Sequence, residues 1–164
     1  DDRSAAEALR RLRGLDERHN LTLLCRDLAE ISTFARVDNS QYRLLKLATP
    51  GPWTFILEAT KEVPRRVSHP SRKTIRLRVP HNALISSLID QVGSPLLSTT
   101  LIPEGENEAL NEAHEIAERY KYDLEAVIDG GPCPADFTTV IDLTGSQPEV
   151  VRRGLGAPQK LGLE

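Results

Sequence analysis

The stretch that best indicates the fold is Thr74-Ile75-Arg76-Leu77-Arg78-Val79-Pro80. Its side chains alternate between apolar and basic, which is the period of two expected of a β-strand with one face against a core. Ile75, Leu77 and Val79 are therefore expected on the buried face, and Arg76 and Arg78 on the other. Because a strand fixes where its side chains point, Arg78 at the strand end is a candidate anion-binding residue.

Two further segments, residues 95–100 and 138–144, combine an apolar run with hydroxyl side chains. Hydroxyl groups both donate and accept hydrogen bonds, and a guanidinium group is a planar fork of donors suited to carboxylate or phosphate. Binding sites in α/β proteins tend to lie at strand ends. If one sheet brings these three strand ends together, they form a polar cleft that accepts anions.

Helical and strand-like segments alternate along most of the chain, with Asp27 and Asn82 as expected N-caps and Gly14 and Gly93 as expected helix ends. The last two strands have no helix between them, which indicates an α/β fold with a mixed sheet and helices packed on it. Strands are expected at residues 21–25, 53–59, 74–79, 95–98, 124–128, 139–143 and 149–152. Helices are expected up to residue 13, with Asp2 or Ser4 as the cap, and at residues 27–34, 39–48, 83–91 and 109–120.

Some elements carry more specific expectations. In the helix that starts at Asn39, the side chains of Tyr42, Leu44 and Leu45 are expected to face inward. The short segment 95–98 is expected to be a buried strand. Residues 61–73 contain two prolines and no periodicity, so they are expected to form a loop.

The chain has 164 residues and a net charge of −3, which fits a single soluble domain over residues 1–164. No apolar run approaches membrane-spanning length and no signal peptide is visible, so no membrane partner and a cytoplasmic location are expected. Cys25 and Cys133 are expected to be reduced, since a disulfide needs an oxidising compartment and a close approach. The sequence lacks methionine and opens like a helix, so a missing N-terminal segment is expected.

Charge is distributed unevenly along the chain. Residues 61–78 contain seven lysines and arginines against Glu62 alone, whereas residues 104–125 contain eight acids against two basic residues. The basic stretch has two interpretations, an anion site for phosphate or nucleic acid and a solvated loop. For the loop residues Arg65, Arg66 and Arg72 the solvated loop is favoured, and for Arg78 the anion site is favoured.

Several catalytic signatures are absent from the sequence. There is no Gly-rich phosphate loop, no dinucleotide fingerprint and no Gly-x-Ser-x-Gly elbow. The four histidines are scattered and form no metal-spaced pair, so no metal site is assigned. Nothing near Ser98 in sequence supplies a base, so its hydroxyl is interpreted as a ligand for an anion or as a backbone cap, and no catalytic residue is assigned.

Taken in order, these segments resemble the YrdC-like family, which includes the L-threonylcarbamoyladenylate synthases. The resemblance rests on residues 49–55, 78–80, 97–100, 138–143 and 151–154. It implies a twisted mixed sheet with a positively charged concave surface, preceded by a strand and a substrate-contacting loop before residue 1. The synthases are nucleotidyltransferases that condense L-threonine, bicarbonate and ATP, with Mg²⁺, into threonylcarbamoyl-AMP and release pyrophosphate. The product serves the modification of adenosine 37 in tRNA, and double-stranded RNA binding is also attributed to the fold.

The resemblance also implies roles for single residues. Arg78 would pair with the threonine carboxylate or a phosphate, Thr138 would face the threonine, and Arg152 would reach the ATP phosphates. Arg13 lies near the position of a family lysine. The hydroxyls of Ser98 and Thr100 would line the nucleotide and carbamate site, although strand-end capping is the alternative for Ser98 and Thr138.

Two positions depart from the synthase pattern. Leu15 falls on an arginine of the synthases, and Leu101-Ile102 stands where the synthases carry Ala-Asn. These departures, together with residues 20–28, 37–39 and 60–66, look like the YciO branch. Three hypotheses follow: a YciO-type nucleotide-binding paralogue with weak or altered synthase activity, a full synthase, and a non-catalytic module that binds double-stranded RNA or tRNA.

Overall fold

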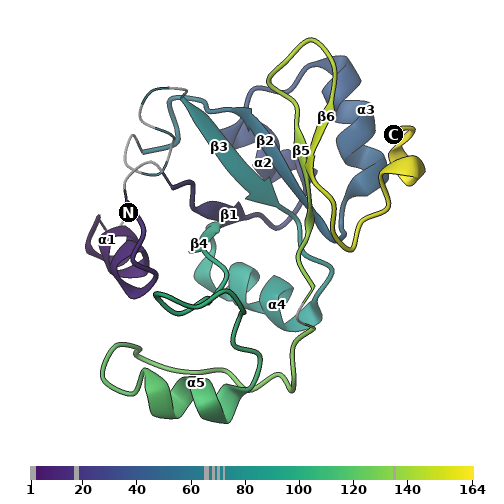
Figure 1. Cartoon of the computed structure of the whole chain (residues 1–164). Coiled ribbons are helices and arrows are strands. Elements are labelled where there is room, and N and C mark those ends of the chain that lie inside the picture. The colour runs from purple at the N-terminus through teal and green to yellow at the C-terminus, as the bar shows by residue number, and fades with distance from the viewer. Residues whose placement is uncertain are drawn as a thin grey trace.

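The computed structural model describes residues 3–16, 19–64, 67, 69, 71, 73–134 and 136–164 (Figure 1). Its helices are α1 (Arg3–Leu12), α2 (Leu28–Phe34), α3 (Asn39–Ala48), α4 (Ala83–Val92) and α5 (Ala113–Arg119), with a 3-10 helix η1 (Pro158–Leu161). Its strands are β1 (Thr22–Leu24), β2 (Trp53–Glu58), β3 (Thr74–Arg78), β4 (Leu96–Ser98), β5 (Thr139–Asp142) and β6 (Glu149–Arg152).

The strands form one mixed sheet, as the sequence predicted. The six strands lie in the order β4-β1-β3-β2-β5-β6. β1 is parallel to β3 and β2 is parallel to β5, whereas the other neighbours are antiparallel. The two parallel pairs require crossover connections, and helices in those connections cover the sheet.

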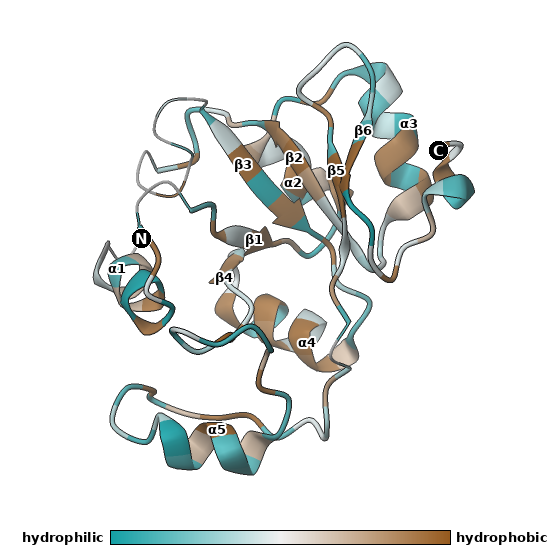
Figure 2. Ribbon diagram, in the orientation of Figure 1, coloured by the Kyte–Doolittle hydropathy of each residue, from teal (hydrophilic) through white to brown (hydrophobic). Residues whose placement is uncertain are grey.

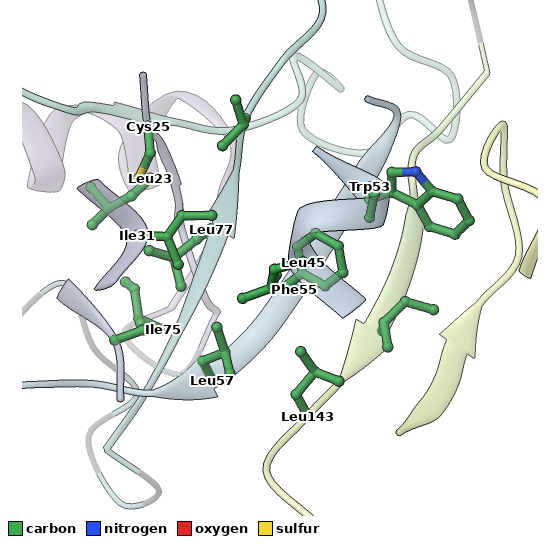
Figure 3. Close-up of a cluster of buried hydrophobic side chains, with 14 of the residues drawn as sticks. Leu23, Cys25, Ile31, Leu45, Trp53, Phe55, Leu57, Ile75, Leu77 and Leu143 are labelled. Carbon is green, nitrogen blue, oxygen red and sulfur yellow. The ribbon is translucent and has the colours of Figure 1, made fainter. Parts of the chain in front are cut away.

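One face of the sheet carries the hydrophobic core. Ile75 and Leu77 of β3 are buried on this face, in agreement with the alternation of their strand. α2 lies behind the sheet in Figure 1 and contributes Ile31 to the same cluster, to which α3 contributes Leu45. Figure 3 shows these side chains around Phe55. The arginines that alternate with the core residues of β3 therefore face away from the core.

The helix caps predicted at Asp27, Asn82 and Gly93 are confirmed. The side chain of Asp27 accepts a hydrogen bond from the backbone N–H of Glu30 at 2.9 Å, and that of Asn82 accepts one from Ile85 at 3.0 Å. Gly93 ends α4 with a φ of 74°, a conformation that glycine adopts without a steric penalty. These caps fix the direction of the chain after β1 and after β3. Both connections border the cavities described below.

Four expectations are wrong. Residues 124–128 form no strand, because no neighbouring strand offers them a partner, and Ile128 is 58% exposed. The helix expected from residue 109 begins only at Ala113, and no α5 side chain is buried; Figure 2 shows α5 as mostly hydrophilic. Tyr42, which was expected to face inward, is 46% exposed on α3. The strand β4, which was expected to be buried, is half-buried because it lies at the edge of the sheet.

Some expectations lie outside the described residues, namely the cap at Asp2 and the loop arginines Arg65, Arg66 and Arg72. Ser4, the alternative cap, lies within α1 and is therefore not its N-cap. The described residues of 61–73 belong to no helix or strand, in agreement with the predicted loop. Among the described helices, none is both long enough and apolar enough to cross a membrane.

Candidate anion-binding site

A cavity of about 660 Å³ lies on the face of the sheet that points away from the core. Residues that alternate with the core side chains form its floor, so every strand contributes to it. α4 adds Ile85, and the chain segments at residues 99–102 and 133–138 border the cavity. The floor consists of Thr22, Leu24, Thr54, Arg76, Arg78, Ser98, Val140 and Arg152.

The six residues predicted from the sequence all line this one cavity: Arg13, Arg78, Ser98, Thr100, Thr138 and Arg152. They do not meet at one edge of the sheet, however. Arg78 is paired with Leu24 at the end of β1, whereas Ser98 is paired with Thr22 at its start. The cavity therefore spans the polar face between two ends of the sheet.

The lining is strongly basic. Arg13, Arg76, Arg78 and Arg152 border the cavity, and no carboxylate does so among the described residues. Burial lowers the pKa of Arg13, Arg76 and Arg78, and the charge of Arg152 lowers that of Arg76 further. The positive charges of these arginines repel one another and are partly desolvated. A bound anion would offset both effects, so the cavity favours an anionic ligand.

The same arginines also have unused hydrogen-bond donors. Within the described part of the chain, the buried Nε atoms of Arg13, Arg76 and Arg78 have no acceptor. A buried donor without an acceptor costs about 1–3 kcal/mol. Phosphate or carboxylate oxygens in the cavity would satisfy such donors and neutralise the charge at the same time.

Arg152 and Thr138 form a connected polar group. The Nη2 atom of Arg152 donates to the carbonyl oxygen of Thr138 at 2.9 Å and to its Oγ1 at 3.3 Å. The Oγ1 atoms of Thr138 and Thr54 are 2.7 Å apart, and the guanidinium of Arg152 lies 5.0 Å from the ring centroid of Phe137. These contacts fix the orientation of an exposed arginine at the cavity.

Close backbone packing next to β5 stabilises the polar group of Arg152 and Thr138. A Cβ added at Gly154 would lie 2.2 Å from the carbonyl oxygen of Phe137. The backbone N–H of Gly154 donates to Oγ1 of the buried Thr139 at 2.9 Å, and Oγ1 of Thr139 donates to the carbonyl oxygen of Gly156 at 2.5 Å. The chain after β6 therefore lies against the start of β5, where only glycine fits.

On the opposite side, Arg13 connects α1 to the segment after β4. Its Nη1 atom donates to Oγ1 of Thr99 at 2.8 Å and also to the carbonyl oxygen of Thr100. The hydroxyl of Ser98 donates to the carbonyl oxygen of Thr22 at 3.0 Å. Since its proton is used in this way, Ser98 caps the backbone and could only accept a hydrogen bond from a ligand.

The sequence interpretation left several lining residues unassigned, including His19, Thr22, Thr54 and Cys133. Alternation along the strands could have identified Thr22 and Thr54, because each stands between two apolar residues that are buried in the core. His19 and Cys133 lie outside the strands and gave no such signal. Burial and the neighbouring charges of Arg13 and Arg76 lower the pKa of His19, which favours its neutral form.

The lining chemistry suits anions better than metal ions. Mg²⁺ in proteins is bound by one or two carboxylates together with phosphates and water. The described lining has no carboxylate, and no group of three potential metal-ligating side chains occurs among the described residues. The described lining therefore lacks the carboxylates with which proteins usually bind Mg²⁺.

Comparison with known proteins shows which family the chain is similar to. A family model named Sua5_yciO_yrdC, described as "Telomere recombination", matches residues 1–154. The uncharacterized protein YciO of Escherichia coli K12 is 46% identical over 156 residues, which are 95% of this chain and 76% of that protein. The crystal structure of E. coli YciO matches with a TM-score of 0.92 and 45% identity, covering 98% of this chain and 78% of that chain.

More distant matches include proteins that are named as enzymes. A threonylcarbamoyl-AMP synthase of Pyrococcus abyssi is 31% identical over 112 residues, which are 68% of this chain and 32% of that protein. A crystal structure of P. abyssi Sua5 complexed with L-threonine matches with a TM-score of 0.84 and 26% identity, covering 93% of this chain and 45% of that chain.

Proposed function

The chain belongs to the Sua5–YciO–YrdC family, and from this premise we propose that it binds ATP, or an adenylate made from ATP, in the arginine-lined cavity. The observation that carries the proposal is the arrangement of four arginines around one cavity without a described carboxylate. A triphosphate supplies the negative charge and the acceptors that these side chains lack.

Different residues of the cavity would contact different parts of the ligand. Arg76 and Arg78 lie on the floor, and we assign them to the phosphates or to the carboxylate of a bound amino acid. Arg152 would reach a phosphate while holding Thr138, whose hydroxyl would face the amino acid. L-Threonine is the proposed amino acid, because a P. abyssi relative was crystallised with it.

The proposed reaction class is that of the related synthases. The amine of L-threonine and bicarbonate would form a carbamate with loss of water, and an oxygen of the carbamate would attack the α-phosphorus of Mg–ATP to give threonylcarbamoyl-AMP, with pyrophosphate as the leaving group. This chemistry needs mainly the positioning of reactants and the neutralisation of charge. The product would be used for tRNA modification, which would place the protein in the cytoplasm.

Two residues support a weak or altered activity in place of full synthase activity. Ile102 lines the cavity at a position where the resemblance implies an asparagine, and isoleucine can neither donate nor accept a hydrogen bond. Leu15, in place of an arginine, is absent from the cavity lining. The proposal is therefore a YciO-type protein whose cavity keeps the anion-binding half of the site and lacks part of its polar contacts.

The test uses the protein with L-threonine, bicarbonate and Mg–ATP. Pyrophosphate release is followed, and threonylcarbamoyl-AMP is identified by mass spectrometry. Weak threonine-dependent release of pyrophosphate supports the proposal, and so does binding of ATP without product formation. In either case, Arg78→Ala should abolish the observed release or binding. Turnover as fast as that of the P. abyssi synthase would overturn the altered-activity part. Absence of any ATP or adenylate binding to the folded protein would overturn the proposal as a whole.

A second candidate function is binding of double-stranded RNA or tRNA. The exposed guanidinium of Arg152 and the open basic face favour it, because duplex RNA is recognised largely through its phosphates and shape. A net charge of −3 opposes it. Fluorescence anisotropy with a labelled RNA duplex and with tRNA, at low and moderate salt, distinguishes the two functions. RNA binding that falls steeply with salt and is not displaced by ATP would favour the RNA module.

A further inference from the structure

A second cavity, of about 550 Å³, lies where the parallel strands β1 and β3 end. The residues that follow β1, Arg26 to Leu28, form one wall, and the residues that follow β3, at positions 79–83, form another. α3 closes the cavity with Tyr42 and Lys46. Its lining shares only Pro80 and Asn82 with the arginine-lined cavity, so it is a separate space.

The topology of the fold explains why this cavity exists. α2 follows β1 and places Ile31 in the core on one face of the sheet. α4 follows β3 and places Ile85 at the cavity on the opposite face. Two neighbouring parallel strands whose helices leave to opposite faces open a crevice beyond their carboxyl ends. In α/β proteins this crevice is the usual position of a ligand.

The lining of the crevice has an excess of positive charge. Arg26 and Lys46 border it, against the carboxylate of Asp27, and His81 adds an imidazole that can form a hydrogen bond. That carboxylate accepts the capping hydrogen bond from the backbone of Glu30, and Arg26 lies 3.5 Å from Asp90. Neither Lys46 nor His81 has a recorded ion pair or hydrogen bond within the described residues.

We propose that the crevice is a second ligand site, for a small organic phosphate. Lys46 and His81 would bind the phosphate group, and the side chains of Leu28, Val79 and Pro80 would contact the carbon skeleton. The cavity volume lies within the range of small-molecule sites, roughly 300–1,000 Å³. A dianionic phosphate suits two basic groups that lack partners. This site does not depend on the function proposed for the arginine-lined cavity.

The experiment is a titration of the isotope-labelled protein with glycerol 3-phosphate, followed by NMR. Backbone amides at residues 26–28, 46, 81 and 83, which line only the crevice, report that site, and those at residues 98–100 and 138 report the arginine-lined cavity. Saturable shifts at the crevice are expected. Lys46→Gln should weaken them about tenfold, the scale of one charge-assisted hydrogen bond. Arg78→Ala, which alters only the other cavity, should leave them unchanged.

The matched control is Arg43→Gln, because Arg43 is an exposed residue of the same helix and does not line the crevice. It removes one charge from α3, as Lys46→Gln does, and should leave the affinity unchanged. Equal weakening by Arg43→Gln would show that only the general charge of α3 attracts the phosphate. That result, shifts confined to the arginine-lined cavity, or no saturable shift would each overturn the proposal. Thermal melting of each variant confirms that the fold is intact.

Discussion

Arg152 holds Thr138 through two hydrogen bonds from one guanidinium nitrogen, at 2.9 Å to the carbonyl oxygen and 3.3 Å to the hydroxyl. Arg152 is the last residue of β6, and Thr138 directly precedes β5, so two antiparallel neighbours hold the contact in place. The cation is thereby oriented before any ligand arrives. Preorganisation of this kind reduces the entropy lost on binding.

Substitution Arg152→Lys should therefore weaken ATP binding although the charge is kept. Lysine offers a point charge without the planar fork of donors, in which Nε of Arg152 also donates to the carbonyl oxygen of Thr138, at 3.3 Å. We expect an affinity loss of about tenfold, on the scale of one charge-assisted hydrogen bond, measured by isothermal titration calorimetry. The neighbouring Arg153 does not line the cavity, so Arg153→Lys is the matched control. Equal losses for both variants would contradict a role for the fork.

Arg78 should show opposite effects on binding and on stability. Arg78→Ala should cost about 1.5–3 kcal/mol of ATP-binding free energy, the scale of a hydrogen bond to a charged group. Arg78→Met should reduce binding similarly, yet raise the melting temperature of the free protein, because burial of an uncompensated cation opposes folding. Calorimetry and thermal melting measure the two effects. Unchanged ATP binding in a folded variant would remove Arg78 from the site.

Gly154→Ala should destabilise the protein. The new Cβ would lie 2.2 Å from the carbonyl oxygen of Phe137, so the backbone must shift, at a cost of about 1–3 kcal/mol or more. Chemical unfolding measures the loss in unfolding free energy. Gly145→Ala is the control, since its Cβ would find no atom closer than 3.7 Å. Equal stability of both variants would show that the chain after β6 is not tightly packed against β5.

The lowered pKa of His19 predicts a dependence of stability on pH. Burial, Arg13 and Arg76 all disfavour the charged imidazolium in the folded state, so the unfolded chain binds the proton more tightly. The unfolding free energy should then fall as the pH drops below about 6.5, the ordinary pKa of histidine. Unfolding of His19→Gln, measured from pH 8 to pH 5, should show a smaller decrease. An unchanged decrease would exclude His19 as its cause.

Nucleotide binding should also act on His19. A bound polyphosphate offsets the positive charge of Arg13 and Arg76, so the pKa of His19 should rise toward its ordinary value. An NMR titration of the imidazole signals with and without ATP measures this change. A pKa of His19 that ATP leaves unaltered would place the phosphates away from these two arginines.

The two cysteines should react very differently. Cys25 is fully buried, and burial raises the pKa of its thiol to about 12, whereas Cys133 is exposed and lines the arginine-lined cavity. Iodoacetamide should therefore alkylate one thiol of the folded protein, as counted by mass spectrometry. Saturating ATP should slow this reaction. Equal rates with and without ATP would show that the ligand leaves the Cys133 side of the cavity open.

Local patterns in the sequence predicted much of the fold. The alternation around Leu77 identified the buried and polar faces of β3, and the caps at Asp27 and Asn82 placed the starts of α2 and α4. These signals depend on neighbouring residues alone, so they can be read from the chain. Residues 124–128 had strand-like composition but form no strand, because a strand also requires a partner that composition does not reveal.

The sequence predicted candidate residues that line one cavity, but it did not predict how they are arranged in it. Arg78, Ser98 and Thr138 were identified from motifs, and all three line the cavity. The contact between the hydroxyls of Thr54 and Thr138 depends on β2 lying beside β5, a pairing between segments 84 positions apart. His19 lies in a connecting segment without periodicity, so no local pattern could place it beside Arg13.

The alternation of side chains along the strands separates the residues that determine ligand binding from the residues that determine stability. Arg76 and Arg78 face the cavity, whereas Ile75 and Leu77 face the core, and each group can change without disturbing the other. A lineage can therefore replace the chemistry of the cavity one side chain at a time while the sheet remains stable. Members of a family with such a sheet can change their substrate through a series of sequences that all still fold.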